Sequence, residues 1–374
     1  MTDILSLQRI NRLTPRADLL RAFAGLPPVE PARVALREAL GGALAEDVRA
    51  TQALPERTIA KADGWAVAGA DVAGAGSYGP AFLTPAPDWV DAGMALPPNA
   101  DTVLNPEDLS VEGGGIAQAT AAPAPGTGTR PAGADASEGE TVLAQGRLLG
   151  AVEIGVLAEM GMAEIAIRRP RIRMVLARKD DRRSALLTRL VENAGGTVVE
   201  ILVPGDTAEE LAPALARGGA DLVLGVGGTG AGRNDHMVEA LRLLASDVVH
   251  GVALHPGMTA AFGAAAHPVL LLPGALEAVL GGWLGLAAPL LARLCGRKEE
   301  AAHHKLVLAD KIASTIGLDE IFLIDEENGT ARPLPLAEAS LAELARARLM
   351  VVVPAGLEGF AAGESVQAHA ISPR

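Results

Sequence analysis

Residues 222–232 read Leu-Val-Leu-Gly-Val-Gly-Gly-Thr-Gly-Ala-Gly, and this stretch decides the fold class. The apolar run Leu222–Val226 predicts a buried strand, Gly227–Gly232 a glycine loop, and Asn234–Leu244 a helix that leaves the loop. In an open α/β sheet, ligands sit beyond the carboxyl ends of the strands. The loop is therefore the first candidate for a binding site.

Strands and helices alternate on both sides of this loop. Thr207, with Glu210 three residues later, predicts a capping box at the start of one of these helices. The alternation indicates a doubly wound, mostly parallel sheet. The other predicted strands are Ile172–Leu176, Val198–Val203 and Pro268–Leu272, and the other helices are Ile154–Met160, Ser184–Ala194, Thr207–Arg217 and Glu277–Arg293.

The remaining sequence has a different texture. Helical spacing is present at Pro15–Leu26 and Pro31–Glu46, whereas Gly69–Gly155 and Lys305–Arg374 contain short apolar runs cut by turns, which is typical of β-rich domains. We therefore predict a multi-domain α/β protein with four parts. These are a helical and linker domain (1–53 and 137–169), a β-rich lobe (54–136), an α/β domain (170–300) and a small β-rich C-terminal domain (301–374).

Composition narrows the class further. The chain has 374 residues and a formal net charge of −13, which argues against a general nucleic-acid-binding protein. Its one cysteine, Cys295, excludes an internal disulfide and is expected to be a core thiol. Val269–Leu294 is rich in leucine and alanine, but Pro273 and Glu277 favour a strand, a turn and a helix over a membrane span. Since Met1–Arg12 lacks the apolar run of a signal peptide, we expect a soluble, cytoplasmic protein.

The glycine loop has two interpretations. Its backbone amides could point at one anion, or the loop could be a tight turn that merely needs small residues. No Lys-Ser or Lys-Thr pair follows, so it is not a P-loop, and its spacing does not fit a dinucleotide fingerprint. Asp235, just after the loop, could contribute to the site or cap the next helix.

Other turns add candidates. His255-Pro256-Gly257 and Pro273-Gly274 are expected near the same edge of the sheet as the glycine loop, and several loops at one edge favour a binding site. Asp63 and Asp101 lie in turns, where a structural role is the simpler interpretation. No cluster of histidine, cysteine and carboxylate residues has the spacing of a metal site.

Seven stretches, in order, resemble segments of the molybdopterin molybdenumtransferases, the family of bacterial MoeA and the E domains of gephyrin and the plant molybdenum insertase. Asp63-Gly64-Trp65-Ala66 is similar to the family's Asp-Gly-Tyr-Ala, and Gly227–Asp235 is similar to its glycine loop. Order and spacing are kept over nearly the whole chain, which is more specific than any single motif. The stretches are Leu54–Val67, Gly93–Leu104, Arg130–Glu140, Gly227–Asp235, Leu254–Gly263, Leu272–Gly274 and Ala345–Val366.

The resemblance implies a homodimer whose α/β domain is similar to molybdopterin-binding proteins. It implies a reaction in which adenylylated molybdopterin and molybdate react with release of AMP, with Mg²⁺ as cofactor. It also implies catalytic roles for Asp63, Asp101 and Asp235, with Asp63 and Asp235 near the metal. The residues implied to hold the pterin phosphate are Gly227, Gly228, Thr229, Gly230, Gly232, His255, Pro256, Gly257, Pro273 and Gly274.

The chain also departs from the family pattern. Ala134 stands where the family has a glutamate, and His255 and Met258 stand where it has two lysines. Each lost charge-assisted contact typically removes about 1.5–3 kcal/mol. Further departures are Ala275-Leu276, Leu318 and Arg178-Lys179-Asp180-Asp181. The basic residues that could supply replacement charge, although a solvated basic face is the simpler interpretation, are Arg178, Lys179, Arg182, Arg183 and Arg233.

Two functions follow from this resemblance. The first is insertion of molybdenum into molybdopterin, which the retained acids favour. The alternative is a non-catalytic binding protein, serving as a carrier, chaperone or assembly partner for a molybdenum enzyme, which the lost lysines favour. An unrelated nucleotide-handling enzyme is a weaker third option. AMP release from adenylylated molybdopterin discriminates the first two.

Overall fold

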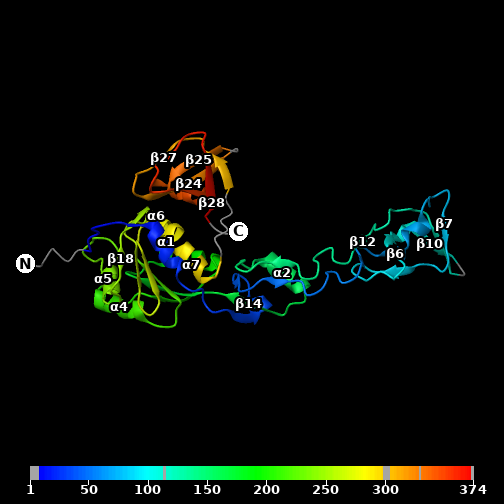
Figure 1. The fold of residues 1–374 in the computed structure, drawn as a ribbon, viewed down its shortest axis with the longest axis horizontal. Coiled ribbons are helices and arrows are strands. Elements are labelled where there is room, and N and C mark those ends of the chain that lie inside the picture. The colour runs from blue at the N-terminus through cyan, green and yellow to red at the C-terminus, as the bar shows by residue number, and fades with distance from the viewer. Residues whose placement is uncertain (1–7, 113–114, 298–303, 328–329, 372–374) are drawn as a thin grey trace, which may run out of the picture. The chain divides into compact units, whose positions relative to one another are not determined.

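The computed structural model describes residues 8–112, 115–297, 304–327 and 330–371, and its ribbon is drawn in Figure 1. The chain separates into two compact units. Unit 1 comprises Met1–Glu46, Gln145–Ala158 and Met162–Arg374, and unit 2 comprises Asp47–Ala144 and Glu159–Gly161. The finer division into four domains stays a prediction.

The glycine loop follows a central strand of a six-stranded sheet in unit 1. The strand order is β16-β15-β17-β21-β20-β18, in which the first four strands run parallel. The pairs β21–β20 and β20–β18 are antiparallel. The mostly parallel sheet predicted from the sequence is confirmed. The strands are β15 (Arg171–Leu176), β16 (Thr197–Leu202), β17 (Leu222–Val226), β18 (Val249–His250), β20 (Ala261–Ala264) and β21 (Pro268–Leu272).

Helices cover both faces of this sheet. Successive side chains of β17 point to opposite faces, and each set packs against different helices. Leu222 and Leu224 belong to a core shared with α1, α3, α6 and α7, whereas Val223 belongs to a core shared with α4 and α5. The capping box of Thr207 and Glu210 is present at the start of α4, as predicted. These helices are α1 (Arg16–Ala24), α3 (Asp181–Asn193), α4 (Ala208–Ala216), α5 (Met237–Arg242), α6 (Leu276–Gly282) and α7 (Ala288–Leu294).

The longest helical stretch is a core element. α6, the π-helical turn η5 (Trp283–Ala287) and α7 form a 19-residue stretch that by length and composition alone could cross a membrane. Of this segment, 56% is buried inside the structure, and Leu286 and Leu290 are fully buried in the core. Cys295 follows α7 and is also buried, and this burial raises the pKa of its thiol to about 12. The expectation of a core thiol is confirmed.

The helix predicted for Pro31–Glu46 is wrong. The segment instead forms two strands that both pair with β14, and Gly41 between them has a φ of 79°, which a helix cannot contain. The strand partner lies far along the chain, so local spacing alone gave the wrong element. The elements of this region are β2 (Ala32–Ala35), the 3-10 turn η2 (Leu36–Glu38), β3 (Ala43–Leu44), α2 (Ala151–Glu159) and β14 (Glu164–Arg168).

The C-terminal part of unit 1 contributes most of a seven-stranded sheet. Its order is β1-β19-β24-β26-β28-β22, with β25 paired to β24. β19 pairs with β24 in parallel, and Arg16 Nε lies 2.6 Å from Asp319 Oδ2 beside this pair. The strands are β1 (Thr14–Pro15), β19 (Val252–His255), β22 (His304–Val307), β24 (Asp319–Glu327), β25 (Thr330–Pro335), β26 (Leu349–Val353) and β28 (Ser365–Ala370), with β23 (Ile312–Ala313), β27 (Gly359–Phe360), η6 (Leu336–Glu338) and α8 (Leu341–Arg346) nearby.

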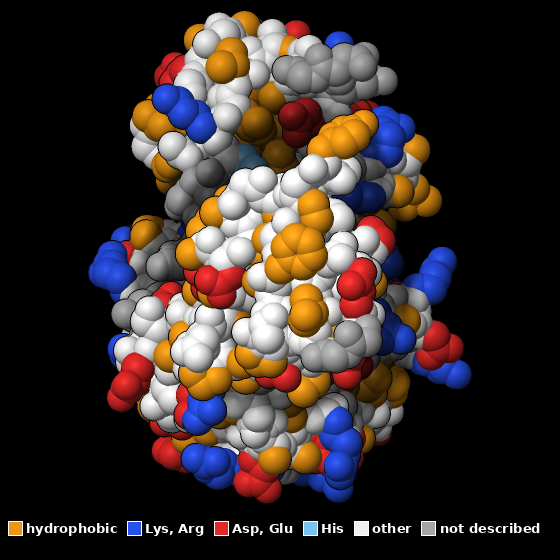
Figure 2. Space-filling view, turned by 90° about the vertical axis from the view of Figure 1, so that its right-hand side faces the viewer, with side chains coloured by type: hydrophobic (Ala, Val, Ile, Leu, Met, Phe, Trp, Pro, Cys, Tyr) orange, Lys and Arg blue, Asp and Glu red, His pale blue; other side chains and the backbone are white. Residues whose placement is uncertain are grey.

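Unit 2 consists of small sheets around two small cores, in agreement with the predicted β-rich lobe. The rings of Trp65 and Trp89 meet edge to face with centroids 5.2 Å apart. Tyr78 and Phe82 are exposed, and Figure 2 shows apolar side chains scattered among charged ones on the face in view. The elements are β4 (Val48–Arg49), β5 (Ile59–Ala60), β6 (Gly64–Val67), η3 (Gly69–Val72), β7 (Ala81–Leu83), β8 (Asp88–Val90), β9 (Thr102–Leu104), η4 (Pro106–Asp108), β10 (Leu109–Glu112), β11 (Ile116–Ala119), β12 (Thr129–Arg130) and β13 (Thr141–Leu143).

Candidate anion-binding site

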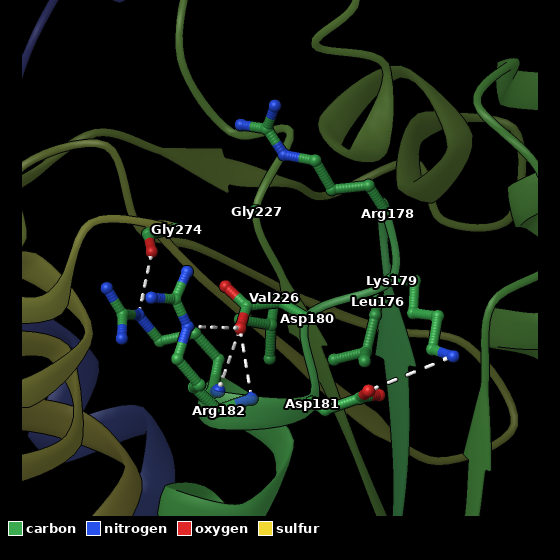
Figure 3. A pocket seen from close by; sticks show the side chains of 10 residues that line it. Leu176, Arg178, Lys179, Asp180, Asp181, Arg182, Val226, Gly227 and Gly274 are labelled. Atoms are coloured by element: carbon green, nitrogen blue, oxygen red, sulfur yellow. Dashed lines mark hydrogen bonds and ion pairs between the residues drawn. The ribbon is translucent and has the colours of Figure 1, made fainter.

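A cleft of about 510 Å³ opens at the carboxyl ends of β15 and β17 in unit 1, as Figure 3 shows. Four of its lining residues are basic and two are acidic, so the cleft is locally positive in a chain of net charge −13. Anionic ligands are attracted to such a site. The lining residues are Leu176, Arg178, Lys179, Asp180, Asp181, Arg182, Arg183, Val226, Gly227 and Gly274.

Both acidic side chains of the cleft have structural partners. Asp180 is the N-cap of α3, and its Oδ1 accepts hydrogen bonds from the backbone N–H groups of Arg182 and Arg183, both at 3.1 Å. The bond from Arg183 is the main cause of the lowered pKa of Asp180. Asp181 lies 3.8 Å from Lys179 Nζ. The negative charges of the cleft are therefore partly neutralised by its own structure.

Of the basic side chains, Arg178 and Arg182 make few interactions within the protein, whereas Arg183 is held by a hydrogen bond. Arg183 Nε donates to the carbonyl of Gly274 at 3.1 Å and ties α3 to the turn after β21. Arg178, in contrast, makes no hydrogen bond or ion pair with any residue that the structure describes. Figure 3 shows its side chain extending away from Asp180 and Asp181. Arg182 is 4.0 Å from Asp180 and its side chain is 90% exposed, so it too can meet a ligand.

Two of the predicted turns meet beside this cleft. The N–H of Gly227 donates to the carbonyl of Leu272 at 2.9 Å, and a Cβ at Gly274 would lie 3.4 Å from Gly227 Cα. Gly227 and Gly228 have φ values of 81° and 67°, which glycine adopts without strain. The glycine loop and the turn Pro273-Gly274 therefore lie at one edge of the sheet, as expected from the sequence.

The turn His255-Pro256-Gly257 follows a strand of another sheet than predicted, but it stays close to the glycine loop, since Thr259 Oγ1 lies 3.0 Å from Thr229 Oγ1. His255-Pro256-Gly257 follows β19, which belongs to the seven-stranded sheet and not to the parallel sheet. Pro256 and Gly257 are buried, and a Cβ at Gly281 of α6 would lie only 1.9 Å from the Pro256 carbonyl oxygen. These residues do not line the cleft, because β19 turns toward the C-terminal strands. Their role in ligand binding stays a prediction.

Asp235 closes the glycine loop. Its Oδ2 accepts the N–H of Gly232 at 2.9 Å, and a Cβ at either Gly230 or Gly232 would lie 2.8 Å from the same oxygen. The helix expected from Asn234 starts only at Met237, and its N-cap residue is His236, so Asp235 does not cap it. Glycine suits both positions because the carboxylate of Asp235 leaves little room for a Cβ atom there.

Asp63 and Asp101 lie in unit 2, at opposite ends of one strand pair. Asp63 precedes β6, whereas Asp101 precedes β9, which is antiparallel to β6 with Val67 opposite Thr102. By this register the two acids are separated by five residues of strand, or roughly 16 Å at ~3.3 Å per residue. Asp63 Oδ1 accepts the N–H of Ala92 at 2.8 Å. The structure therefore does not bring these two acids together within the lobe.

Carboxylates that could hold a metal ion are dispersed. Among the residues that the structure describes, no three histidine, cysteine, aspartate or glutamate residues are grouped to hold one. Mg²⁺ needs fewer protein ligands, since one or two carboxylates, water and substrate phosphates often suffice. Asp235 fits that requirement chemically, because Oδ1 accepts no hydrogen bond from the described residues. The roles of Asp63, Asp101 and Asp235 stay predictions.

The fold is that of a doubly wound α/β protein, and its positively charged cleft lies at the carboxyl edge of the sheet, where such folds bind ligands. Comparison with known families agrees with this description. Residues 8–161 match the MoeA N-terminal region (domain I and II). Residues 171–293 match a domain described as a probable molybdopterin binding domain.

Similar proteins cover the chain nearly from end to end. Molybdopterin molybdenumtransferase 2 of Mycobacterium tuberculosis is 27% identical over 97% of this chain and 98% of its own. The molybdopterin molybdenumtransferase of Haemophilus influenzae is 26% identical over 78% of this chain and 80% of its own. The crystal structure of a molybdopterin biosynthesis MoeA protein from Pyrococcus horikoshii matches with a TM-score of 0.73, 23% identity, and coverage of 96% and 100%. The chain belongs to the family of MoeA-type molybdopterin molybdenumtransferases.

Proposed function

We propose that this chain acts in molybdenum cofactor biosynthesis. It binds adenylylated molybdopterin in unit 1 and inserts molybdenum from molybdate, with release of AMP. Relatives that cover 97% and 78% of the chain are named molybdopterin molybdenumtransferases, which supports this activity. The observation that carries the proposal is the positive cleft at the carboxyl edge of the parallel sheet, where Gly227 and Gly274 meet.

The exposed arginine side chains of the cleft replace the positive charge that the family's lysines would supply. Where those lysines are expected, this chain has His255 and Met258. Arg178 and Arg182 extend into solvent at the cleft with little internal pairing, so their guanidinium groups are available to phosphate oxygens. We infer that the phosphate groups of the ligand contact these two arginines.

A carboxylate of unit 1 adds a metal ligand to the proposed site. Asp235, at the glycine loop, would hold Mg²⁺ together with ligand phosphates. When bound, the ion would neutralise charge on the phosphates at which AMP departs. Catalytic roles for Asp63 and Asp101, each of which accepts a backbone N–H within unit 2, belong to the same proposal.

The carrier alternative is not favoured. The relatives that match the full chain are named as transferases, and the positive cleft suits a phosphate-bearing substrate as well as it suits a stored ligand. The family match also sets aside an unrelated nucleotide-handling enzyme. A homodimer, a cytoplasmic location and a molybdenum-enzyme client belong to the same proposal.

The proposed ligand site is tested by equilibrium binding of adenylylated molybdopterin. Arg178→Ala and Arg182→Ala should each weaken binding about tenfold, because a charge-assisted contact contributes about 1.5 kcal/mol or more. Arg189→Ala is the matched control. Arg189 lies on α3, as Arg182 does, but it pairs with Glu192 and does not line the cleft. Equal affinities for wild type and both cleft variants would place the ligand elsewhere.

A further inference from the structure

A side chain from the N-terminal segment holds the glycine loop. Gln8 is only 5% exposed, and its Nε2 donates to the carbonyl oxygens of Gly228 at 3.0 Å and Gly230 at 3.1 Å. Its Oε1 accepts the N–H of Glu239 at 2.9 Å. Both donors of the amide are used, and both are used on the loop.

The carbonyl of the intervening residue is held from another element. The carbonyl oxygen of Thr229 lies 3.0 Å from Nε2 of the buried His250, and Thr229 Oγ1 lies 3.0 Å from Thr259 Oγ1. A carbonyl can only accept, so this ring nitrogen carries the proton. Burial lowers the pKa of His250, which favours the neutral ring. The carbonyls of three successive loop residues are thus bonded to side chains outside the loop.

The donors of the same loop are left over. The N–H groups of residues 228–231 make no hydrogen bond with any residue that the structure describes. Consecutive unpaired amides in such a loop form a concave site for an anion. A loop this rich in glycine has many conformations to lose, so holding its carbonyls in place reduces the cost of binding.

We propose that Gln8 is a positioning residue, which fixes the glycine loop so that its free N–H groups receive a phosphate group of the ligand. This proposal rests on the proposed function, since it assigns the loop to that ligand. Gln8 itself does not contact the ligand. It acts by keeping the binding-competent loop conformation populated, and the apparent Kd rises as that population falls.

Two variants of similar shape test the proposal. Gln8→Met keeps the length of the side chain and removes all three hydrogen bonds, and Gln8→Glu keeps the acceptor but removes both donors. At pH 7.5 we expect each variant to bind adenylylated molybdopterin about tenfold more weakly than wild type. Arg9→Ala changes the exposed neighbouring residue and should bind like wild type.

Lowering the pH provides a rescue that a merely structural defect would not show. The introduced carboxyl group of Gln8→Glu faces two carbonyl oxygens, so its pKa should be raised, and once protonated it can donate one bond. Binding by Gln8→Glu relative to wild type should therefore improve toward pH 5, whereas Gln8→Met should show no such recovery. Wild type measured at each pH is the reference for effects on the other charged or titratable groups near the loop, which are Asp235, His236, Glu239 and His250.

Hydrogen exchange of the free protein separates this inference from the proposed function. The amide of Met237 donates to the Gly228 carbonyl that Gln8 also holds, and it should exchange faster in both Gln8 variants than in wild type, whether or not a ligand binds. If the folded Gln8 variants bind the pterin with the same Kd as wild type, the positioning role of Gln8 is overturned. If wild type does not bind the pterin, the proposed function fails, and unchanged exchange at Met237 would then overturn the role of Gln8 as well.

Discussion

At the scale of single residues, Asp101 gives a direct link between geometry and pH. Its Oδ1 accepts the N–H of Gly69 at 2.7 Å and the hydroxyl of Thr102 at 2.8 Å. These bonds, the first above all, lower the pKa of the Asp101 carboxyl. The folded lobe therefore gains stability above the ordinary aspartate pKa of about 3.9, and loses that gain as the pH falls through the lower folded pKa.

The substitution Asp101→Asn should accordingly destabilise unit 2 at pH 7, and its difference from wild type should shrink below about pH 4. Urea unfolding of the full chain at pH 7 and pH 3.5 measures this difference. Asp88→Asn is a suitable control, because the Asp88 side chain is exposed and makes no hydrogen bond or ion pair with the described residues. A difference that stays constant with pH would contradict the account of Asp101.

Single residues were the least predictable level. The sequence left Asp235 open between a cap and a site residue, and only the structure shows it closing the loop. The basic residues at 178–183 read more simply as a solvated face, because their local pattern does not reveal a cleft. Gln8 gave no signal, since its partners Gly228 and Gly230 lie more than 200 positions away.

At the scale of elements, close backbone contact explains why α6 needs glycine. Gly281 packs directly on Pro256, and a Cβ there would lie 1.9 Å from the Pro256 carbonyl oxygen. Gly155 in α2 has the opposite environment, with nothing within 4 Å of an added Cβ. The two helical glycines therefore form a matched pair.

We expect Gly281→Ala to destabilise the protein by about 3 kcal/mol, because backbone must move to relieve the overlap. Gly155→Ala should instead stabilise by about 0.5–1 kcal/mol, since alanine has the higher helix propensity. Urea unfolding followed by circular dichroism compares the two. Similar shifts for both substitutions would argue against the packing of α6 on the turn after β19.

Elements with a local signal were predicted well. The strand Leu222–Val226 and the capping box at Thr207 depend on nearby residues, and both are present. The helix predicted for Pro31–Glu46 was wrong because β2 and β3 are stabilised by pairing with β14, which is distant in sequence. Gly41, with a φ of 79°, is the one local residue that argues against a helix there. The turn His255-Pro256-Gly257 was assigned to the wrong sheet, since the pairing of β19 with β24 is not visible in either strand alone.

At the scale of the whole molecule, the order of motifs predicted more than any site residue did. The collinear resemblance identified the family, and matches over residues 8–161 and 171–293 confirm it. Of the three acids predicted to be catalytic, Asp63 and Asp101 lie in unit 2 and Asp235 lies in unit 1.

The most direct test of the account is release of AMP by the purified full-length protein. It is mixed with adenylylated molybdopterin, molybdate and Mg²⁺, and AMP is followed over time. We predict molybdate-dependent release of AMP that falls when Arg178 is replaced by alanine, because the cleft then binds the substrate more weakly. Tight binding of the pterin without any AMP release would contradict the transferase account and leave a carrier in its place.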